Sequence, residues 1–450
     1  MTDLDRTFPW LATFNKRLAK LDLIDNIVLA VSGGSDSMAL LHIVSRWKRA
    51  LKHKACPRLV CTTVNHGLRP EAAQEARDVS AWACELGIEH RTLKWVGEKP
   101  TSSIQDMARG ARYRLIGDLI HRLPGQTVVL TGHTRDDQAE TVMMRLTRGS
   151  GPEGLAGIAA TTYAHGYHLH RPLLDLSREE LRMFLRSIGV KWLNDPSNEA
   201  TIFERIRVRR NKPTRRALGL EDKPLARTAW RMSRANSALN EIAYRFLSER
   251  VQQDGMLQRY GIFRWDRLCR DLPEEIALRV LRRIVRSVGG QSKNPNLGQT
   301  EQLFEKIKEV DFLGATLAGC RAVRCSKKHE AEMLLFRESG RAGLPRFSLT
   351  LRAPTSTIWD RRFRLTFKAA EAARCDIEIA ALGSHLSGLR ARHPVILQSL
   401  PALPADALKA LPGIYVQGEL VAAPSLGLCQ SGYQVGAKFL VKNLFDIFEE

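Results

Sequence analysis

The segment IVLAVSGGSDS, residues 27–37, decides the fold of this chain. Its first five residues form a short apolar run bounded by polar residues, which predicts a buried strand. The adjacent glycines Gly33 and Gly34 allow a tight turn in which no Cβ atom covers the backbone N–H groups. Apolar residues then recur at helical spacing through Met38, Leu41 and Val44. The segment therefore predicts a strand, a turn and the start of a helix.

The turn of this segment is suited to an anion. Backbone N–H groups, the positive end of the following helix and serine hydroxyls all meet there, so we predict that it binds phosphate. The predicted phosphate-binding residues are Ser32, Gly33, Gly34, Ser35, Asp36 and Ser37. An ordinary serine-capped turn is the alternative. The turn lacks the Gly-x-x-x-x-Gly-Lys and Gly-x-Gly-x-x-Gly spacings, so it is neither a Walker A loop nor a dinucleotide fingerprint.

Asp36 is the only carboxylate in the turn. A carboxylate would repel a phosphate group unless Mg²⁺ stood between the two. We therefore predict that Asp36 is the metal-binding residue of the site and takes part in catalysis.

Strands and helices alternate outward from this segment. Short runs over residues 59–64, 89–93 and 127–131 predict further strands, and helix-length amphipathic stretches separate them. Such alternation predicts an α/β domain with a parallel, Rossmann-like sheet that is covered on both faces. Ligands in sheets of this kind lie at the carboxyl ends of the strands.

The character of the sequence changes after about residue 199. Helical patterns dominate to about residue 308, and shorter alternating runs follow a break that contains glycine and proline at residues 340–345. We predict three parts: an α/β catalytic domain over residues 1–215, a helical domain over 216–338, and a small mixed α+β domain over 339–450.

The chain carries 69 Lys and Arg against 48 Asp and Glu, a net charge of +21. An excess of this size favours a polyanionic partner, with nucleic acid preferred over an anionic membrane surface and over a merely basic surface. Two arginine-rich stretches are candidates for phosphate contacts. The first spans residues 205–216, and the second is a helical face that carries Arg279, Arg282, Arg283 and Arg286. A solvated outer face is the alternative for the second.

Other features exclude several classes of protein. No apolar run approaches the roughly 20 residues of a membrane span, and the first ten residues are not a secretory signal, so we expect a cytoplasmic protein with no membrane partner. The eight cysteines include no Cys-x-x-Cys pair, so the chain predicts neither a zinc ribbon nor a disulfide framework.

Three more strings identify a family. They are VNHGLR at 64–69, DMARGARY at 106–113 and GHTRDDQAET at 132–141. Together with SGGSDS they resemble the tRNA(Ile)-lysidine synthetases of the PP-loop ATP pyrophosphatase superfamily, over about residues 25–210. Segments 194–198, 358–365 and 418–424 also resemble that family.

The resemblance implies a reaction. ATP would be cleaved between its α and β phosphates to adenylylate carbon 2 of the wobble cytidine in the CAU anticodon of an isoleucine tRNA. The ε-amino group of free L-lysine would then displace AMP. The cofactors would be ATP and Mg²⁺, and, because family members are often dimers, a homodimer is an expected form. His66, Gly132 and His133, at or just beyond strand ends, would contact the nucleotide, with capping or core histidines as the alternative.

Two side-chain pairs suit this chemistry. Asp137 and Glu140 are three residues apart and share a helical face, so we predict that they bind the lysine ammonium and help it to lose a proton. Partners for the helix dipole are the alternative. Arg109 and Arg112 also share a face, and Arg112 is predicted to neutralise charge on the α-phosphate or the cytidine oxygen. Surface pairing with Asp106 is the alternative there.

Two other functions stay open at this point. Another PP-loop tRNA modifier, such as a 2-thiolase, would use paired cysteines, and Cys56 and Cys61 are not spaced as that motif. A non-catalytic RNA-binding protein that senses ATP would not need three acids beside the polyphosphate.

Overall fold

The computed structural model describes residues 3–445, except 22, 52–55, 98–103, 194–203, 326–331, 341–342, 352, 369–374, 399, 402 and 432. The predicted family segment 194–198 lies outside the described residues. The chain forms two compact units, Met1–Ser237 and Ala238–Ile447. The three predicted domain ranges remain a proposal.

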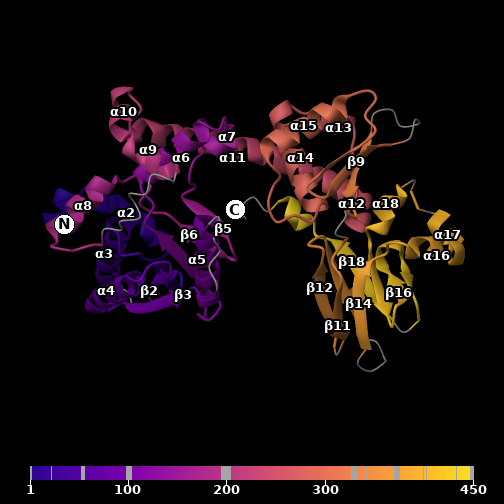
Figure 1. Ribbon diagram of the computed structural model, residues 1–450, viewed down its shortest axis with the longest axis horizontal. Helices are drawn as coiled ribbons and strands as arrows, with labels where there is room; N and C mark the ends of the chain where they lie inside the picture. The colour runs from indigo at the N-terminus through magenta and orange to yellow at the C-terminus, as the bar shows by residue number, and fades with distance from the viewer. Residues whose placement is uncertain are drawn as a thin grey trace. The chain divides into compact units, whose positions relative to one another are not determined.

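Unit 1 is built on a six-stranded sheet (Figure 1). Its order is β3 (Glu89–Lys94), β2 (Arg58–Asn65), β1 (Asn26–Ala30), β4 (Thr127–Thr131), β6 (Tyr167–His170) and β5 (Thr161–Ala164). All neighbours are parallel except β5, which pairs with β6 as an antiparallel hairpin at the edge. The four predicted strands and the α/β fold class are confirmed, and the edge hairpin is an addition.

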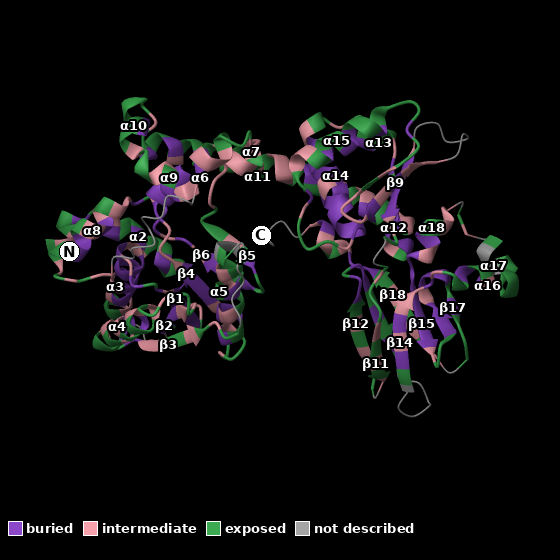
Figure 2. Ribbon diagram, in the orientation of Figure 1, coloured by how far each residue is buried: buried purple, intermediate pink, exposed green. Residues whose placement is uncertain are grey.

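The two faces of this sheet bury alternate residues of the same strand. Ile27 and Leu29 of β1 pack in one core cluster with the helices α2 (Trp10–Leu18), α3 (Ser35–Ala50), α4 (Ala72–Glu85) and α8 (Arg178–Ser187). Val28 points the other way, into a cluster with α5 (Ile104–Ile120). Burial on both faces explains why β1 is a continuous apolar run, and Figure 2 shows the central strands β1, β2 and β4 largely buried.

Unit 1 also contains several helices besides those named above. They are α1 (Asp3–Thr7), η1 (Ala19–Leu21), α6 (Arg135–Leu146), α7 (Pro152–Leu155), α9 (Glu204–Arg210), α10 (Lys212–Ala217) and the start of α11 (Asp222–Gln253). In α6, Ala139 and Val142 pack against Leu225 and Ala229 of α11. That contact fixes the helix that carries two of the predicted acids.

Unit 2 begins with helices around a small antiparallel sheet. The helices are α12 (Gly255–Tyr260), α13 (Arg267–Arg270), α14 (Glu274–Val288) and α15 (Leu297–Lys308). The sheet has the order β7 (Phe263–Trp265), β10 (Met333–Arg337), β9 (Cys320–Arg324) and β8 (Ala315–Leu317). The stretch up to residue 308 is mainly helical, as predicted, but the prediction missed the strand β7 within it, which pairs with β10 of the small sheet.

Two antiparallel sheets form the rest of unit 2. One has the order β11 (Phe347–Leu351), β14 (Cys375–Ala381), β15 (Pro412–Val416), β16 (Glu419–Ala423) and β17 (Leu428–Cys429); the other has β12 (Thr355–Trp359), β13 (Phe363–Phe367) and β18 (Val435–Phe439). Between β14 and β15 lie the short helices α16 (His385–Arg392), α17 (Pro394–Gln398) and α18 (Ala405–Lys409); η3 (Pro424–Leu426) lies between β16 and β17, and η4 (Val441–Leu444) follows β18. Buried and exposed residues alternate along β13, as its sequence predicts.

The prediction that the arginine face of α14 contacts RNA is wrong for three of its four arginines; the fourth, Arg282, is half-buried and donates to the carbonyl of Pro295 at 3.2 Å. Arg279, Arg283 and Arg286 are only 6–7% exposed. Arg279 and Arg283 donate hydrogen bonds to the side-chain oxygen of Asn240, at 2.8 and 3.0 Å, and Arg286 donates to the carbonyl of Asn443. The helix is covered on both faces, so these guanidinium groups hold unit 2 together.

Replacing Arg283 should therefore affect folding and leave RNA binding unchanged. We expect Arg283→Ala to lower the free energy of unfolding by about 1–3 kcal/mol, because it removes a buried charged hydrogen bond to Asn240. Urea unfolding measures this, and RNA titrations at several salt concentrations measure the second part. Arg267→Ala is the control, since that side chain is 85% exposed. A weaker RNA complex with unchanged stability would contradict the assignment.

In the described part of the chain, no helix combines the length and apolar character needed to cross a membrane.

Candidate active site

The turn after β1 has the geometry that its glycines predict. Gly33 adopts a φ of +86°, which favours glycine, and Gly34 is the N-cap of α3. The Ser37 hydroxyl accepts a hydrogen bond from the backbone N–H of Ser32 at 3.2 Å and donates one to the carbonyl of Gly34 at 2.9 Å. These bonds fold the turn over the first turn of α3, where the backbone N–H groups have no partner within the helix.

Gly132, just beyond the end of β4, fits closely against this turn. A Cβ atom at Gly132 would lie 2.9 Å from the carbonyl carbon and oxygen of Asp36 and 3.0 Å from the backbone nitrogen of Ser37. Only a glycine therefore allows the end of β4 to approach the start of α3 so closely. This contact supports a packing role for Gly132 beside its predicted contact with nucleotide.

Substituting Gly132 should consequently move the turn. We expect Gly132→Ala to lower kcat/KM for ATP about 10–100-fold, because a small misplacement of phosphate-binding groups has effects of that size. Steady-state kinetics with ATP as the varied substrate measure it. Gly436→Ala is a matched control, since a Cβ atom there would meet nothing within 4 Å. Unchanged ATP kinetics in Gly132→Ala would show that the close approach is not required.

Three acidic side chains converge beside the turn. Asp36 comes from the first turn of α3, and Asp137 and Glu140 come from α6. Asp137 is 8% exposed and Glu140 is 2% exposed. Both helices start at the carboxyl ends of neighbouring parallel strands, β1 and β4, so the sheet brings together the three predicted acids.

One arginine binds all three acids. Arg178, the first residue of α8, donates from Nε to Asp36 Oδ2 at 3.1 Å and from a terminal nitrogen to Glu140 Oε1 at 2.8 Å. Its other terminal nitrogen donates to Asp137 Oδ1. These ion pairs hold an acidic cluster that would otherwise repel itself.

Two arginines of α9 complete the cluster. Arg205 donates to Glu140 Oε2 at 2.8 Å and to Asp137 Oδ1 at 2.9 Å. Arg209 donates to both carboxylate oxygens of Glu140, at 2.8 and 3.2 Å. Both belong to the arginine-rich stretch predicted to contact RNA phosphates, and in this structure their partners are the acids of the site.

Asp137 also forms a capping box with Thr134 at the N-terminus of its own helix, α6. Its Oδ2 accepts hydrogen bonds from the backbone N–H and the hydroxyl of Thr134, at 2.7 and 2.8 Å, while Oδ1 faces Arg178 and Arg205. The Asp137 side chain therefore interacts with the N-terminus of α6, as in the alternative that the sequence left open, and it also belongs to the acidic cluster.

The protonation of the acids follows from these partners. Burial alone would raise the pKa of Glu140, but the hydrogen bonds and charges of Arg209 and Arg178 lower it to about 2. Burial raises the pKa of Asp36 in spite of the Arg178 charge. Glu140 is therefore a carboxylate at neutral pH, while Asp36 keeps its charge less easily.

A second group of ion pairs involves Asp136, the residue before Asp137. Lys212 of α10 binds Asp136 at 2.7 Å and Asp222 at 2.5 Å, and the buried Arg215 binds Asp222 at 2.6 Å. These pairs join α6, α10 and α11, so they support the position of the acids on α6.

Comparison with known proteins shows the family. Residues 11–213 match the family model described as PP-loop domain. The tRNA(Ile)-lysidine synthase of Bradyrhizobium diazoefficiens is 42% identical over 314 residues, which cover 68% of this chain and 84% of the relative. Its counterpart from Ruegeria pomeroyi is 35% identical over 409 residues, 89% of this chain and 88% of the relative. The tRNA(Ile)-lysidine synthase of Rhodopseudomonas palustris is 44% identical over 287 residues, which cover 63% of this chain and 80% of the relative.

This chain belongs to the tRNA(Ile)-lysidine synthase family. The sequence-based resemblance is thereby confirmed, and with it an ATP-dependent, tRNA-modifying ligase. The Ruegeria match extends across most of unit 2, so the likeness is not confined to the PP-loop domain.

The predicted histidines lie at the carboxyl edge of this synthase-family sheet. His133 follows β4, and its Nδ1 forms a hydrogen bond with the Thr131 hydroxyl at 2.8 Å. Burial lowers the pKa of His133 to about 3, so the ring is neutral at neutral pH. His66 follows β2 and makes an edge-on contact with the Trp95 ring, 6.0 Å between centroids. Both lie at the edge of the sheet where ligands of such folds bind, and their contact with nucleotide stays a prediction.

Arg112 stands apart from the acids. It is exposed on α5, and within the described residues it forms no ion pair with Asp36, Asp137 or Glu140. Its neighbour Arg109 lies over the Tyr113 ring, 5.3 Å from the centroid. The side chain of Asp106 lies outside the described part, so the alternative of pairing with it stays a prediction.

Arg178 and Arg182 of α8 are site residues that sequence reasoning missed. Arg182 lies one turn after Arg178 and donates to the hydroxyl of Ser35 at 3.4 Å. The string Ser177-Arg178-Glu179-Glu180 marks a helix start, and Ser177 and Glu180 do form a capping box. That signal places the helix but not the direction of its arginine side chains.

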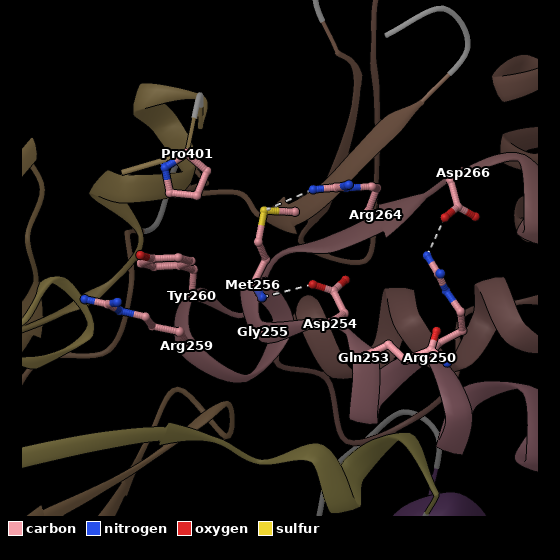
Figure 3. A pocket seen from close by; sticks show the side chains of 10 residues that line it. All are labelled: Arg250, Gln253, Asp254, Gly255, Met256, Arg259, Tyr260, Arg264, Asp266 and Pro401. Atoms are coloured by element: carbon pink, nitrogen blue, oxygen red, sulfur yellow. Dashed lines mark hydrogen bonds and ion pairs between the residues drawn. The ribbon is translucent and has the colours of Figure 1, made fainter. Parts of the chain in front are cut away.

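A separate cavity of about 530 Å³ lies wholly within unit 2 (Figure 3). Its lining includes the ion pair of Arg250 and Asp266, at 2.5 Å, and Arg264, whose guanidinium points to the sulfur of Met256. Because the acidic cluster and the phosphate turn belong to unit 1, this cavity is not the catalytic site.

Proposed function

We propose that this chain joins L-lysine to carbon 2 of the wobble cytidine of the CAU-anticodon isoleucine tRNA. The reaction proceeds through an adenylylated cytidine and releases AMP and pyrophosphate. One observation carries the proposal: Asp36, Asp137 and Glu140 converge beside a phosphate-binding turn in a member of the tRNA(Ile)-lysidine synthase family.

The residues of the turn suit an ATP polyphosphate with Mg²⁺. Asp36 supplies one carboxylate, and its Oδ2 accepts a hydrogen bond from Arg178. That oxygen therefore already binds a positive charge. Mg²⁺ is commonly bound through one or two carboxylates and substrate phosphates, so the single carboxylate of Asp36 is a sufficient protein ligand. When bound, Mg²⁺ would neutralise phosphate charge.

Asp137 and Glu140 suit the lysine ammonium. They are buried carboxylates, and they already bind cationic side chains. With a pKa of about 2, Glu140 is a strong anionic partner but a weak base. Help with deprotonation therefore requires that the arginines first move off these acids.

The other predicted roles follow from position and charge. Arg112 is exposed on α5 and is proposed to neutralise charge on the α-phosphate or the cytidine oxygen. The net charge of +21 supports a tRNA partner. ATP, free lysine and tRNA meet in the cytoplasm, which is where we place the reaction.

A single assay tests the function. The protein is mixed with ATP, Mg²⁺, radiolabelled lysine and a CAU-anticodon isoleucine tRNA transcript, and a transcript with uridine at the wobble position is the control. Lysine-dependent AMP release with label in the first transcript alone is expected. Modification only with sulfur donors would favour thiolation, and an absence of AMP would favour ATP sensing.

A further inference from the structure

Arg178 lies between the two halves of the site. Asp36 belongs to the phosphate half, because it is part of the turn after β1, and its Oδ1 accepts a hydrogen bond from the Ser35 hydroxyl at 3.1 Å. Asp137 and Glu140 form the other half, on α6. Among the described residues Arg178 alone binds all three, since Arg205 and Arg209 contact only the acids of α6.

The backbone of Arg178 is held at the start of α8, and a rotation of its side chain would not disturb that position. Its N–H donates to Asp136 Oδ2 at 2.9 Å, and the capping box of Ser177 and Glu180 holds the residue at the start of α8. The side chain is 16% exposed, and its guanidinium borders the phosphate turn through Asp36. A change of rotamer can therefore redirect the charge while the helix stays in place.

Arg178 binds the carboxylate oxygens that the proposed function assigns to Mg²⁺ and to the lysine ammonium group. Three carboxylates face three guanidinium groups in the cluster, so its charge is already balanced. A lysine ammonium would be the fourth cation against three anions, and binding it requires that a guanidinium leave. A polyphosphate in the turn offers Arg178 a new anionic partner, because guanidinium groups form strong, charge-assisted hydrogen bonds with phosphate as well as with carboxylate.

We propose that Arg178 couples the two halves of the site. The polyphosphate of bound ATP draws the guanidinium of Arg178 off the acids, and this movement opens Asp137 and Glu140 to the ammonium group of lysine. Arg178 is thus a positioning residue that makes lysine binding depend on nucleotide. The inference rests on the proposed function, since it assumes that those two acids receive lysine.

The coupling is reciprocal by thermodynamic necessity. If nucleotide strengthens lysine binding by some factor, lysine strengthens nucleotide binding by the same factor. Lysine binding to the protein is therefore measured by calorimetry, with and without a non-hydrolysable ATP analogue and Mg²⁺. In the wild type we expect the analogue to lower the Kd for lysine about tenfold or more, which is within the usual coupling range.

Arg178→Gln should remove the coupling. We expect the analogue to change the lysine Kd less than about twofold in this variant. Arg182→Gln is the matched control, because Arg182 is on the same helix, touches the turn at Ser35 and has no bond to the α6 acids. It should weaken nucleotide binding and keep the coupling factor. If Arg178→Gln does not fold, Arg178→Lys is used in its place. Its coupling factor should be at least threefold lower than that of the wild type, because a single ammonium group cannot bind three acids as a guanidinium does.

Several results would overturn the proposal. They are a coupling below twofold in the wild type, an unchanged factor in the Arg178 variants, and an equal loss of coupling in Arg182→Gln. The proposed function is judged separately by transfer of labelled lysine to tRNA. Transfer without coupling would refute only the role of Arg178, whereas coupling without transfer would refute only the ligase reaction.

Discussion

We expect Asp36→Ala to abolish AMP formation and to leave tRNA affinity nearly intact. We expect kcat to fall at least about 10³-fold, because a side chain that places charge at the reacting phosphates has effects of that order. The loss should concern chemistry alone. Asp36 lies in the turn of unit 1, and Arg178 keeps its bonds to Asp137 and Glu140 when Asp36 is removed.

Two measurements separate chemistry from binding in this variant. AMP release from labelled ATP reports the first, and filter binding of tRNA reports the second. Asp175→Ala is the control, since its carboxylate is 65% exposed and pairs only with Arg17 at the surface of the described chain. A large loss of tRNA affinity in Asp36→Ala would refute the assigned role.

The fold and the acids of the site were readable from sequence for physical reasons. A buried parallel strand needs apolar residues on both faces, so β1 is a continuous apolar run that ends at the glycine turn. Strand ends in such a sheet share one edge. That rule was enough to predict that Asp36, Asp137 and Glu140 would meet.

The arginines of the site were not readable in the same way. Arg178 lies 142 residues from Asp36 in sequence, and helix-start signals do not specify where a long side chain points. Periodicity failed differently at α14. It separates two faces of a helix, but it does not reveal that the basic face is also covered, as at Arg283.

Replacement of Glu140 tests how much the acidic cluster contributes to folding. Its pKa of about 2 in the folded chain lies below the ordinary 4.5, because Arg209 and Arg178 hold the charged form. A difference of that size corresponds to about 3 kcal/mol of stability. We therefore expect Glu140→Gln to lower the free energy of unfolding by about 3 kcal/mol at pH 7, and to raise the KM for lysine more than that for ATP.

The pH dependence of this effect has a defined sign. The pKa is depressed in the folded chain, so the contribution of Glu140 is complete above pH 4.5 and is lost as the pH falls toward 2. The difference in urea unfolding between wild type and Glu140→Gln should thus shrink to less than half by about pH 3. Glu179→Gln, at a 61% exposed side chain paired with Arg186, is the control and should change stability by no more than about 0.5 kcal/mol. A difference that stays constant from pH 7 to pH 3 would show that the charge of Glu140 is not what stabilises the fold.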